Sequence, residues 1–343
     1  MIFTPARSVL CAVIALTATA WGPLSAQEVF QESAALTRRA DEQVATEGAL
    51  FLLLPVGAQG VAMGRAMSAM PTQEAAFWNP AGLASLEEGR FMVYRGDHLA
   101  GTATAFSLLF TPNPVGTVGV SYQLLDIGEQ DLTDNEGNVI GRIGVRNHLA
   151  IASFATSLLS RLDAGLNFKV VQFRVSCSGQ CVDGGVTATT YALDAGIQSR
   201  PSEGLPLRLG FMVAHLGPNL QVINAEQSDP LPTRVRLSGA YEVLNHFTES
   251  GKVDLWVTAE LEDRATDLGS PSLYMGTELS AGTTGSIFVR AGYVAGDIEQ
   301  VNGAAVGAGL RYQSFDVAIA KSLADSGLEG DSEPVHITFS VLF

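Results

Sequence analysis

The sequence predicts an all-β protein: a transmembrane antiparallel β-barrel of about fourteen strands. Segments with alternating apolar and polar side chains recur from Gly89 to the end of the 343-residue chain, which is the pattern of strands with two different faces. Hydrophobic residues make up 47% of the chain, yet no segment after the N-terminal region is as long and apolar as a membrane-spanning helix.

Residues 1–26 are predicted to be a signal peptide. Arg7 precedes an apolar run of about thirteen residues, which is shorter than the roughly twenty that a membrane-spanning helix needs. Small residues follow at Ser25 and Ala26, as at secretory cleavage sites. Cleavage is expected after Ala26, with Ala20 as the alternative.

Two segments of different character precede the strands. Residues 27–48 are polar and receive no functional role. Residues 49–86 lack the strand alternation and are rich in Gly, Ala and Met, a composition that packs closely against other backbone. The spacing of Gly57, Gly60 and Gly64 also suggests a phosphate-binding loop, but no βαβ pattern accompanies it.

Residues 87–343 are predicted to form the barrel. The expected strands are residues 89–97, 101–111, 116–127, 144–158, 162–176, 188–199, 206–217, 233–244, 252–263, 271–280, 285–295, 303–312, 314–323 and 334–343. Short turns such as Ser160-Arg161 alternate with longer loops such as residues 128–143 and 218–232, as in outer-membrane barrels. A soluble sandwich with one solvated face shows the same alternation along a strand, but the even strand number and the loop lengths favour the barrel.

The alternation also predicts which side chains face lipid. In the strand at residues 162–176, we expect Leu162, Leu166 and Phe168 to face lipid and Asp163, Asn167 and Lys169 to face the lumen. The opposite facing would place a lysine in hydrocarbon, at a cost of about 2 to 4 kcal/mol near the midplane.

Cys177 and Cys181 are predicted to form a disulfide in an extracellular loop. An exported protein meets an oxidising environment, where a close pair of cysteines is normally bonded. A redox pair would have two intervening residues, and a zinc site would need two more ligands where only Asp183 lies nearby.

The chain ends in an amphipathic strand. Its apolar face carries Ile337, Phe339, Val341 and the terminal Phe343. A final strand that closes on Phe resembles the signal read by the outer-membrane assembly machinery, which is therefore an expected partner together with outer-membrane lipid.

The segment at residues 49–86 resembles the N-terminal signature of a known family. The run Leu53-Leu54-Pro55-Val56-Gly57-Ala58 is followed by Gly60, Met63 and Gly64 and then by Trp78-Asn79-Pro80-Ala81-Gly82-Leu83. This pattern resembles the PorV/PorQ family of the FadL-like outer-membrane barrels. The resemblance implies a hatch that plugs the barrel, with a motif made of Gly57, Gly60, Gly64, Trp78, Asn79, Pro80, Ala81 and Gly82. Arg65 stands where the family often has a small residue.

Composition and motifs exclude several other functions. A formal net charge of -15 argues against nucleic acid as a partner. The five His residues are scattered and form no metal-ligand spacing, so neither a metal nor a cofactor is expected. Glu260 and Glu262 share one strand face, which is better explained by a hydrated lumen than by acid–base catalysis. We therefore expect no enzyme.

The resemblance implies a role in type IX protein secretion in the outer membrane of a Gram-negative-type bacterium. Type IX translocon components and secreted cargo would then be the partners. The alternative is a FadL-like channel for the uptake or diffusion of hydrophobic compounds, with a hydrophobic small molecule as its ligand. A general porin is a weaker interpretation, because an open pore has no need of a plug motif.

Overall fold

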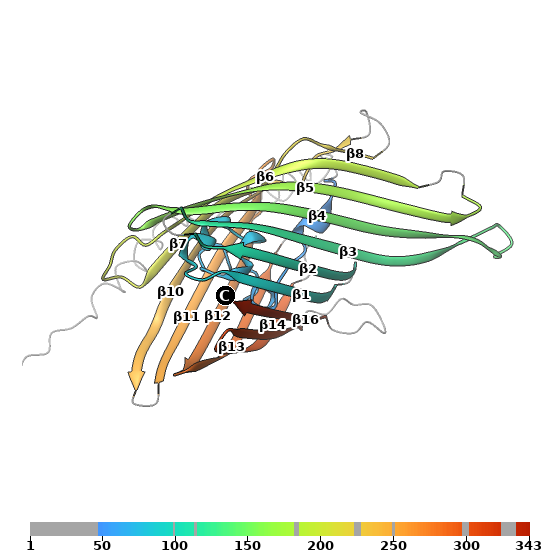
Figure 1. The fold of residues 1–343 in the computed structure, drawn as a ribbon. Helices are drawn as coiled ribbons and strands as arrows, with labels where there is room; N and C mark the ends of the chain where they lie inside the picture. The colour runs from blue at the N-terminus through green and yellow to red at the C-terminus, as the bar shows by residue number, and fades with distance from the viewer. Residues whose placement is uncertain are drawn as a thin grey trace, which may run out of the picture. The chain divides into compact units, whose positions relative to one another are not determined.

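The fold is a closed antiparallel β-barrel (Figure 1). The computed structural model describes residues 47–98, 100–112, 115–181, 185–222, 228–248, 251–296, 302–323 and 334–343. The predicted signal peptide and all but the last two residues of the polar segment 27–48 lie outside the described residues.

Fourteen of the strands in these residues form the barrel, as the sequence predicts. They are β1 (Arg90–His98), β2 (Gly101–Phe110), β3 (Thr117–Thr133), β4 (Val139–Leu159), β5 (Leu162–Gly179), β6 (Val186–Ser199), β7 (Leu207–Leu216), β10 (Arg234–Thr248), β11 (Gly251–Arg264), β12 (Ser272–Gly282), β13 (Gly285–Ala295), β14 (Gly303–Tyr312), β15 (Phe315–Ser322) and β16 (Val335–Leu342). The first and last strands pair, with Arg90 opposite Leu342, and so close the barrel. Closure satisfies every backbone edge, which is what a sheet in lipid requires.

The short strands β8 (Leu220–Gln221) and β9 (Ser228–Asp229) form a separate two-stranded ribbon between β7 and β10. Among the described residues, no helix has the length and apolar character needed to cross a membrane.

Side chains alternate between the two faces of the barrel wall, and the facing predicted for β5 is confirmed. Leu166 and Phe168 are 58% and 47% exposed on the outside, whereas Asn167 and Lys169 are each 1% exposed on the inside. An apolar exterior over a polar interior is the arrangement of a barrel that lies in lipid.

The loop predicted at residues 128–143 is wrong, because β3 and β4 continue through most of it as a long hairpin. Its turn is closed by Asp134, whose carboxylate accepts hydrogen bonds from the backbone N–H groups of Glu136 and Asn138, both at 2.9 Å. The prediction failed because β3 carries consecutive polar residues here, so the contrast between its two faces disappears. Figure 1 shows the hairpin of β3 and β4, with β5 beside it, extending beyond the neighbouring strands.

The two ends of the barrel differ in their connections. Two-residue turns join β4 to β5, β12 to β13 and β14 to β15 at one end, which is therefore the periplasmic end. The opposite end carries the β3–β4 hairpin and the longer connection from β7 to β10. Cys177 lies at this extracellular end of β5 and is bonded to Cys181, so the predicted disulfide is present.

Candidate functional site

Residues 49–86, here called the hatch segment, lie against the inner face of the barrel. They form four short helical elements: η1 (Leu50–Leu53), α3 (Ala58–Ala62), η2 (Gln73–Ala76) and η3 (Pro80–Ser85). The element η3 contacts β4, β5 and β6, whereas α3 contacts β13 to β16. The hatch segment thus reaches two opposite parts of the wall, and Figure 1 shows its short coils among the strands.

Asn79 joins the hatch segment to β6. Its side-chain oxygen accepts a hydrogen bond from the backbone N–H of Ala81 at 3.1 Å, which caps η3. Its side-chain nitrogen donates to the carbonyl of Ser68 at 2.8 Å and to that of Ile197 in β6 at 3.3 Å. A Cβ atom at Gly196 would collide with the Asn79 side chain. The approach of Asn79 to the wall therefore depends on a glycine at this position of β6.

Glu74 holds the first half of the hatch segment to the second. Its carboxylate accepts hydrogen bonds from the backbone N–H groups of Gly60 and Gln59, at 2.9 and 3.2 Å, and from the hydroxyl of Thr338 at 3.3 Å. Gly57 has a φ of 99°, and a side chain there would meet the carboxylate. Burial raises the pKa of Glu74 from an ordinary 4.5 to about 7.

One side of the lumen is built from buried ion pairs. In β5 and β6, the ammonium group of Lys169 lies 2.6 Å from the carboxylate of Asp194. The same carboxylate accepts hydrogen bonds from the backbone N–H of His215 at 2.9 Å and from the amide of Asn167 at 2.8 Å. Asn167 also donates to the carbonyl of Ala76 at 2.9 Å, so this network holds the hatch segment as well as the wall.

A second ionic group lies on β10 and β11. Glu260 accepts hydrogen bonds from the backbone and side chain of Ser68 in the hatch segment, at 2.7 and 2.9 Å. Glu262 lies 2.6 Å from Arg236. The two glutamates noted in the sequence therefore bind the hatch segment and a buried arginine, in keeping with a structural role.

The inner face of β1 to β6 carries an apolar cluster toward the extracellular end. The wall residues of this cluster include Ala103, Ala105, Leu125, Leu149, Val171 and Ala188. Phe51 and Leu52 of η1 pack against them from the lumen side. The lumen therefore has an ionic part and an apolar part, and η1 covers the apolar part together with Leu220 and Leu231 from the connection between β7 and β10.

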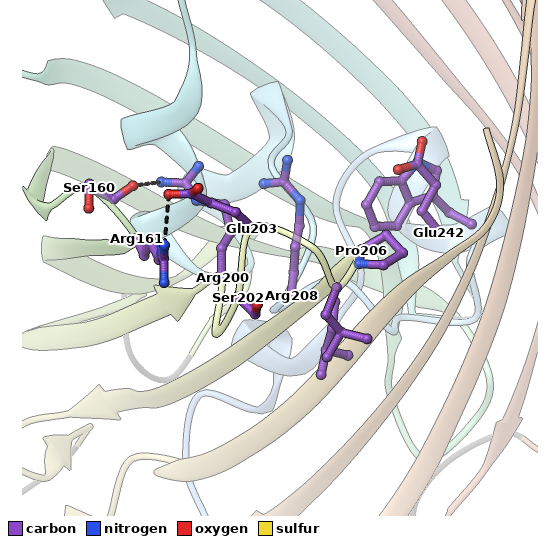
Figure 2. A pocket seen from close by; sticks show the side chains of 11 residues that line it. Ser160, Arg161, Arg200, Ser202, Glu203, Pro206, Arg208 and Glu242 are labelled. Carbon is purple, nitrogen blue, oxygen red and sulfur yellow. Dashed lines mark hydrogen bonds and ion pairs between the residues drawn. The ribbon is translucent and has the colours of Figure 1, made fainter. Parts of the chain in front are cut away.

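A pocket of about 250 Å³ opens at the periplasmic end of the lumen (Figure 2). It lies between the β4–β5 turn, the β6–β7 connection with the start of β7, and the middle of β10 and β11. The charged and aromatic side chains that line it are Arg161, Arg200, Glu203, Arg208, Glu242 and Trp256.

The three arginines of this pocket differ in their partners. Arg161 lies 2.7 Å from Glu203, and Arg200 lies 3.2 Å from Asp163. The guanidinium carbon of Arg208 lies 5.6 Å from the centroid of the Trp256 ring. Within the part of the chain that the structure describes, no carboxylate comes within ion-pair distance of Arg208.

The residues of the predicted hatch motif contact different parts of the hatch segment and of the wall. Trp78 donates its indole N–H to the carbonyl of Val56 at 3.0 Å, and a side chain at Gly60 would meet its ring. A side chain at Gly64 would meet backbone atoms of β12 and β13. Arg65, the departure from the family pattern, adopts a φ of 70°.

The other predicted sites lie elsewhere. Ile337, Phe339 and Phe343 are exposed on the outside of the barrel, and Val341 is partly buried on the same face. Their role as an assembly signal stays a prediction.

The periplasmic pocket was not predicted from the sequence. Its members come from two connections and from strands β7, β10 and β11, which no local motif links. The available signal was weak: Arg208 and Trp256 both fall on the lumen face of their predicted strands.

Comparisons with known proteins identify the fold. No protein-family model and no curated protein matches the chain. Among solved structures, the toluene transporter TbuX of Ralstonia pickettii has a TM-score of 0.51 at 12% identity and covers 84% of this chain and 98% of its own. The P. putida toluene transporter TodX gives 0.51 at 12% identity, with coverage of 84% and 98%. The CymD monoaromatic hydrocarbon channel gives 0.50 at 11% identity, with coverage of 87% and 98%.

This likeness concerns the fold alone, since all three identities are low. Together with the apolar exterior, it identifies the chain as an outer-membrane barrel of a Gram-negative-type bacterium, as the sequence predicts. Membership of the PorV/PorQ family stays a prediction.

Proposed function

We propose that the protein is a non-catalytic channel that carries hydrophobic small molecules across the outer membrane. The apolar inner wall of β1 to β6 carries this proposal. A porin for polar solutes has a polar lumen, whereas apolar surface inside a barrel offers a hydrophobic compound about 25 cal/mol for each Å² that it buries.

The solved structures of similar fold support the same choice. Two of them are named toluene transporters and one a monoaromatic hydrocarbon channel. They favour the channel over the secretion role that the hatch motif implies.

The hatch segment would control access to this apolar wall. Phe51 and Leu52 already occupy it, so a hydrophobic ligand would have to displace η1 or pass beside it. Transport would then need local movement of η1 while the ionic contacts of the hatch segment persist.

The test is the uptake of radiolabelled toluene by cells that express the protein and otherwise lack such a channel. Val171→Asp places a charge on the apolar wall and should reduce uptake to the background level, because an unpaired charge in apolar surroundings binds water. Val171→Leu keeps the wall apolar and should retain uptake. Heat-modifiable migration on gels would show that both variants form barrels. Equal uptake by the two variants would exclude the apolar wall as the path.

A role in type IX secretion is the second candidate. The run Trp78-Asn79-Pro80-Ala81-Gly82 in the hatch segment supports it. If it holds, deletion of the protein in its own cell should leave secreted cargo inside the cell, and toluene uptake should not change.

A further inference from the structure

The pocket at the periplasmic end has the chemistry of a ligand site. We propose that it binds a small organic anion: a carboxylate carried on a flat apolar body of about one ring. Charge, shape and size support this assignment separately.

Arg208 supplies the positive charge of the site. Arg161 and Arg200 are compensated by Glu203 and Asp163. The third carboxylate, that of Glu242, accepts a hydrogen bond from the amide of Asn245 at 2.8 Å and lies 4.0 Å from the ammonium group of Lys252. The guanidinium group of Arg208 lies over the face of Trp256, and no carboxylate among the described residues lies within ion-pair distance of it. A guanidinium group presents a planar fork of donors that matches the two oxygens of a carboxylate. A free fork that faces a cavity is therefore a site for such an anion.

The apolar side of the pocket limits the shape of its ligand. Leu205, Pro206 and the ring of Trp256 line it, and the Trp256 ring lies beside the guanidinium group of Arg208. An aromatic or alicyclic ring would pack on these groups while its carboxylate reached Arg208. An inorganic anion would leave this apolar surface uncovered.

The size of the pocket excludes long chains. The pocket volume of about 250 Å³ lies just below the range of about 300 to 1,000 Å³ usual for sites of drug-sized ligands. A single ring with a carboxylate fits such a volume, whereas an extended acyl chain does not.

The pocket adjoins the hatch segment. Trp256 packs against a cluster that includes Met63, Met67 and Met70 of that segment. A compound that left the lumen would meet the pocket at the periplasmic exit. This link to transport rests on the proposed channel function, but binding to the pocket does not.

Binding is tested by calorimetric titration of benzoate into the purified full-length protein in detergent. We expect one saturable site in the wild type. Arg208→Gln should weaken binding at least about tenfold, equivalent to about 1.4 kcal/mol. Arg146→Gln is the matched control, because Arg146 is an exposed arginine on β4 that is paired with Asp126 at 3.0 Å, and it should leave binding unchanged.

A second set of variants distinguishes loss of the binding site from misfolding of the barrel. Arg208→Lys keeps the charge but loses the fork, and Trp256→Leu removes the ring platform. Each should weaken benzoate binding while heat-modifiable migration shows a folded barrel.

Three results would overturn the proposal: no benzoate binding to the wild type, equal binding by Arg208→Gln, or displacement of benzoate by an equal concentration of inorganic phosphate. If the wild-type protein bound benzoate but supported no toluene uptake, the proposed channel function would be wrong and the pocket assignment would still hold.

Discussion

Asn79 links two parts of the hatch segment to the barrel wall through a single amide. Replacement by Ala would leave the carbonyl of Ile197 and the N–H of Ala81 without this partner, and each buried polar group left unpaired costs about 1 to 3 kcal/mol. We expect Asn79→Ala to loosen the hatch segment without opening the barrel, because the strand ladder closes independently of it. Limited proteolysis should cut the hatch segment faster, while heat-modifiable migration stays normal.

Asn138→Ala is the matched control for this change, since Asn138 lies in the exposed β3–β4 turn. It should leave cleavage of the hatch segment at the wild-type rate. An Asn79→Ala variant as protected as the wild type would contradict the role given to Asn79.

We expect the packing of the hatch segment around Glu74, here called its closed state, to depend on pH. Its pKa of about 7 in the closed state exceeds the ordinary 4.5 that it would regain on exposure to water. The closed state therefore binds more protons between these values, so its stability falls as the pH rises from about 4.5 to 7, by a total of about 3 kcal/mol. Hydrogen exchange at the Gly60 amide, corrected for the intrinsic rate, should accelerate over this interval.

Glu74→Gln stays neutral and keeps an acceptor for one of the two backbone donors. Its corrected exchange rate should be flat from pH 5 to 8. A wild-type rate that is equally flat would show that Glu74 does not control closure.

At the scale of elements, the β5–β6 pair is held by an ion pair inside the lumen. Lys169 and Asp194 have side-chain exposures of 2% and 0%, and removal of one member of a buried pair typically costs about 3 to 5 kcal/mol. We expect Lys169→Met to destabilise the barrel by this amount. Urea unfolding of the refolded protein in detergent measures it.

Lys169→Met combined with Asp194→Asn is the control for charge. The asparagine oxygen can still accept the hydrogen bond from His215, and no unpaired charge remains, so most of the stability should return. A double variant no more stable than Lys169→Met alone would contradict a charge-based cause.

The strands could be predicted because a barrel wall between lipid and a polar lumen requires apolar and polar side chains to alternate along each strand. Leu166, Phe168 and Lys169 show it clearly, and their facing follows directly from the sequence. The extension of β3 and β4 could not be predicted, because both faces of that hairpin meet water and the alternation loses its physical cause.

The lumen could be predicted only in part. Sequence indicates that residues 49–86 pack closely, but the docking of Asn79 beside Gly196, and of Ser68 beside Gly210, depends on how far each strand is shifted around the barrel. No local pattern carries that register. The periplasmic pocket could not be predicted for the same reason, because its arginines come from the β4–β5 turn, the residue after β6 and the start of β7.

At the scale of the whole molecule, the ionic part and the apolar part of the lumen contact different parts of the hatch segment. The ionic groups on β5, β6, β10 and β11 bind its later part through Ala76 and Ser68. The apolar wall of β1 to β6 is covered by side chains of η1 and its neighbours, by Phe77, and by Leu220 and Leu231 from the connection between β7 and β10. Hydrophobic contacts have no fixed geometry, so η1 can leave the wall while the ionic part of the hatch segment stays in place.

This division predicts that the apolar contacts of η1 limit permeation. Phe51 and Leu52 are 6% and 8% exposed, whereas Leu50 in the same helical turn is 54% exposed. Truncation of a buried Phe or Leu to Ala costs about 2 to 5 kcal/mol, which would release η1 from the wall. The double variant Phe51→Ala with Leu52→Ala should therefore increase the initial rate of hydrophobic dye uptake by whole cells.

Leu50→Ala removes the same kind of side chain from the same turn, but from a position that is 54% exposed. It should leave dye uptake at the wild-type rate, because little apolar burial is lost. If the double variant matched the wild type, η1 would not be the barrier to permeation. If Leu50→Ala raised uptake as much as the double variant, general disruption of the turn would explain the result, and the packing of Phe51 and Leu52 would not.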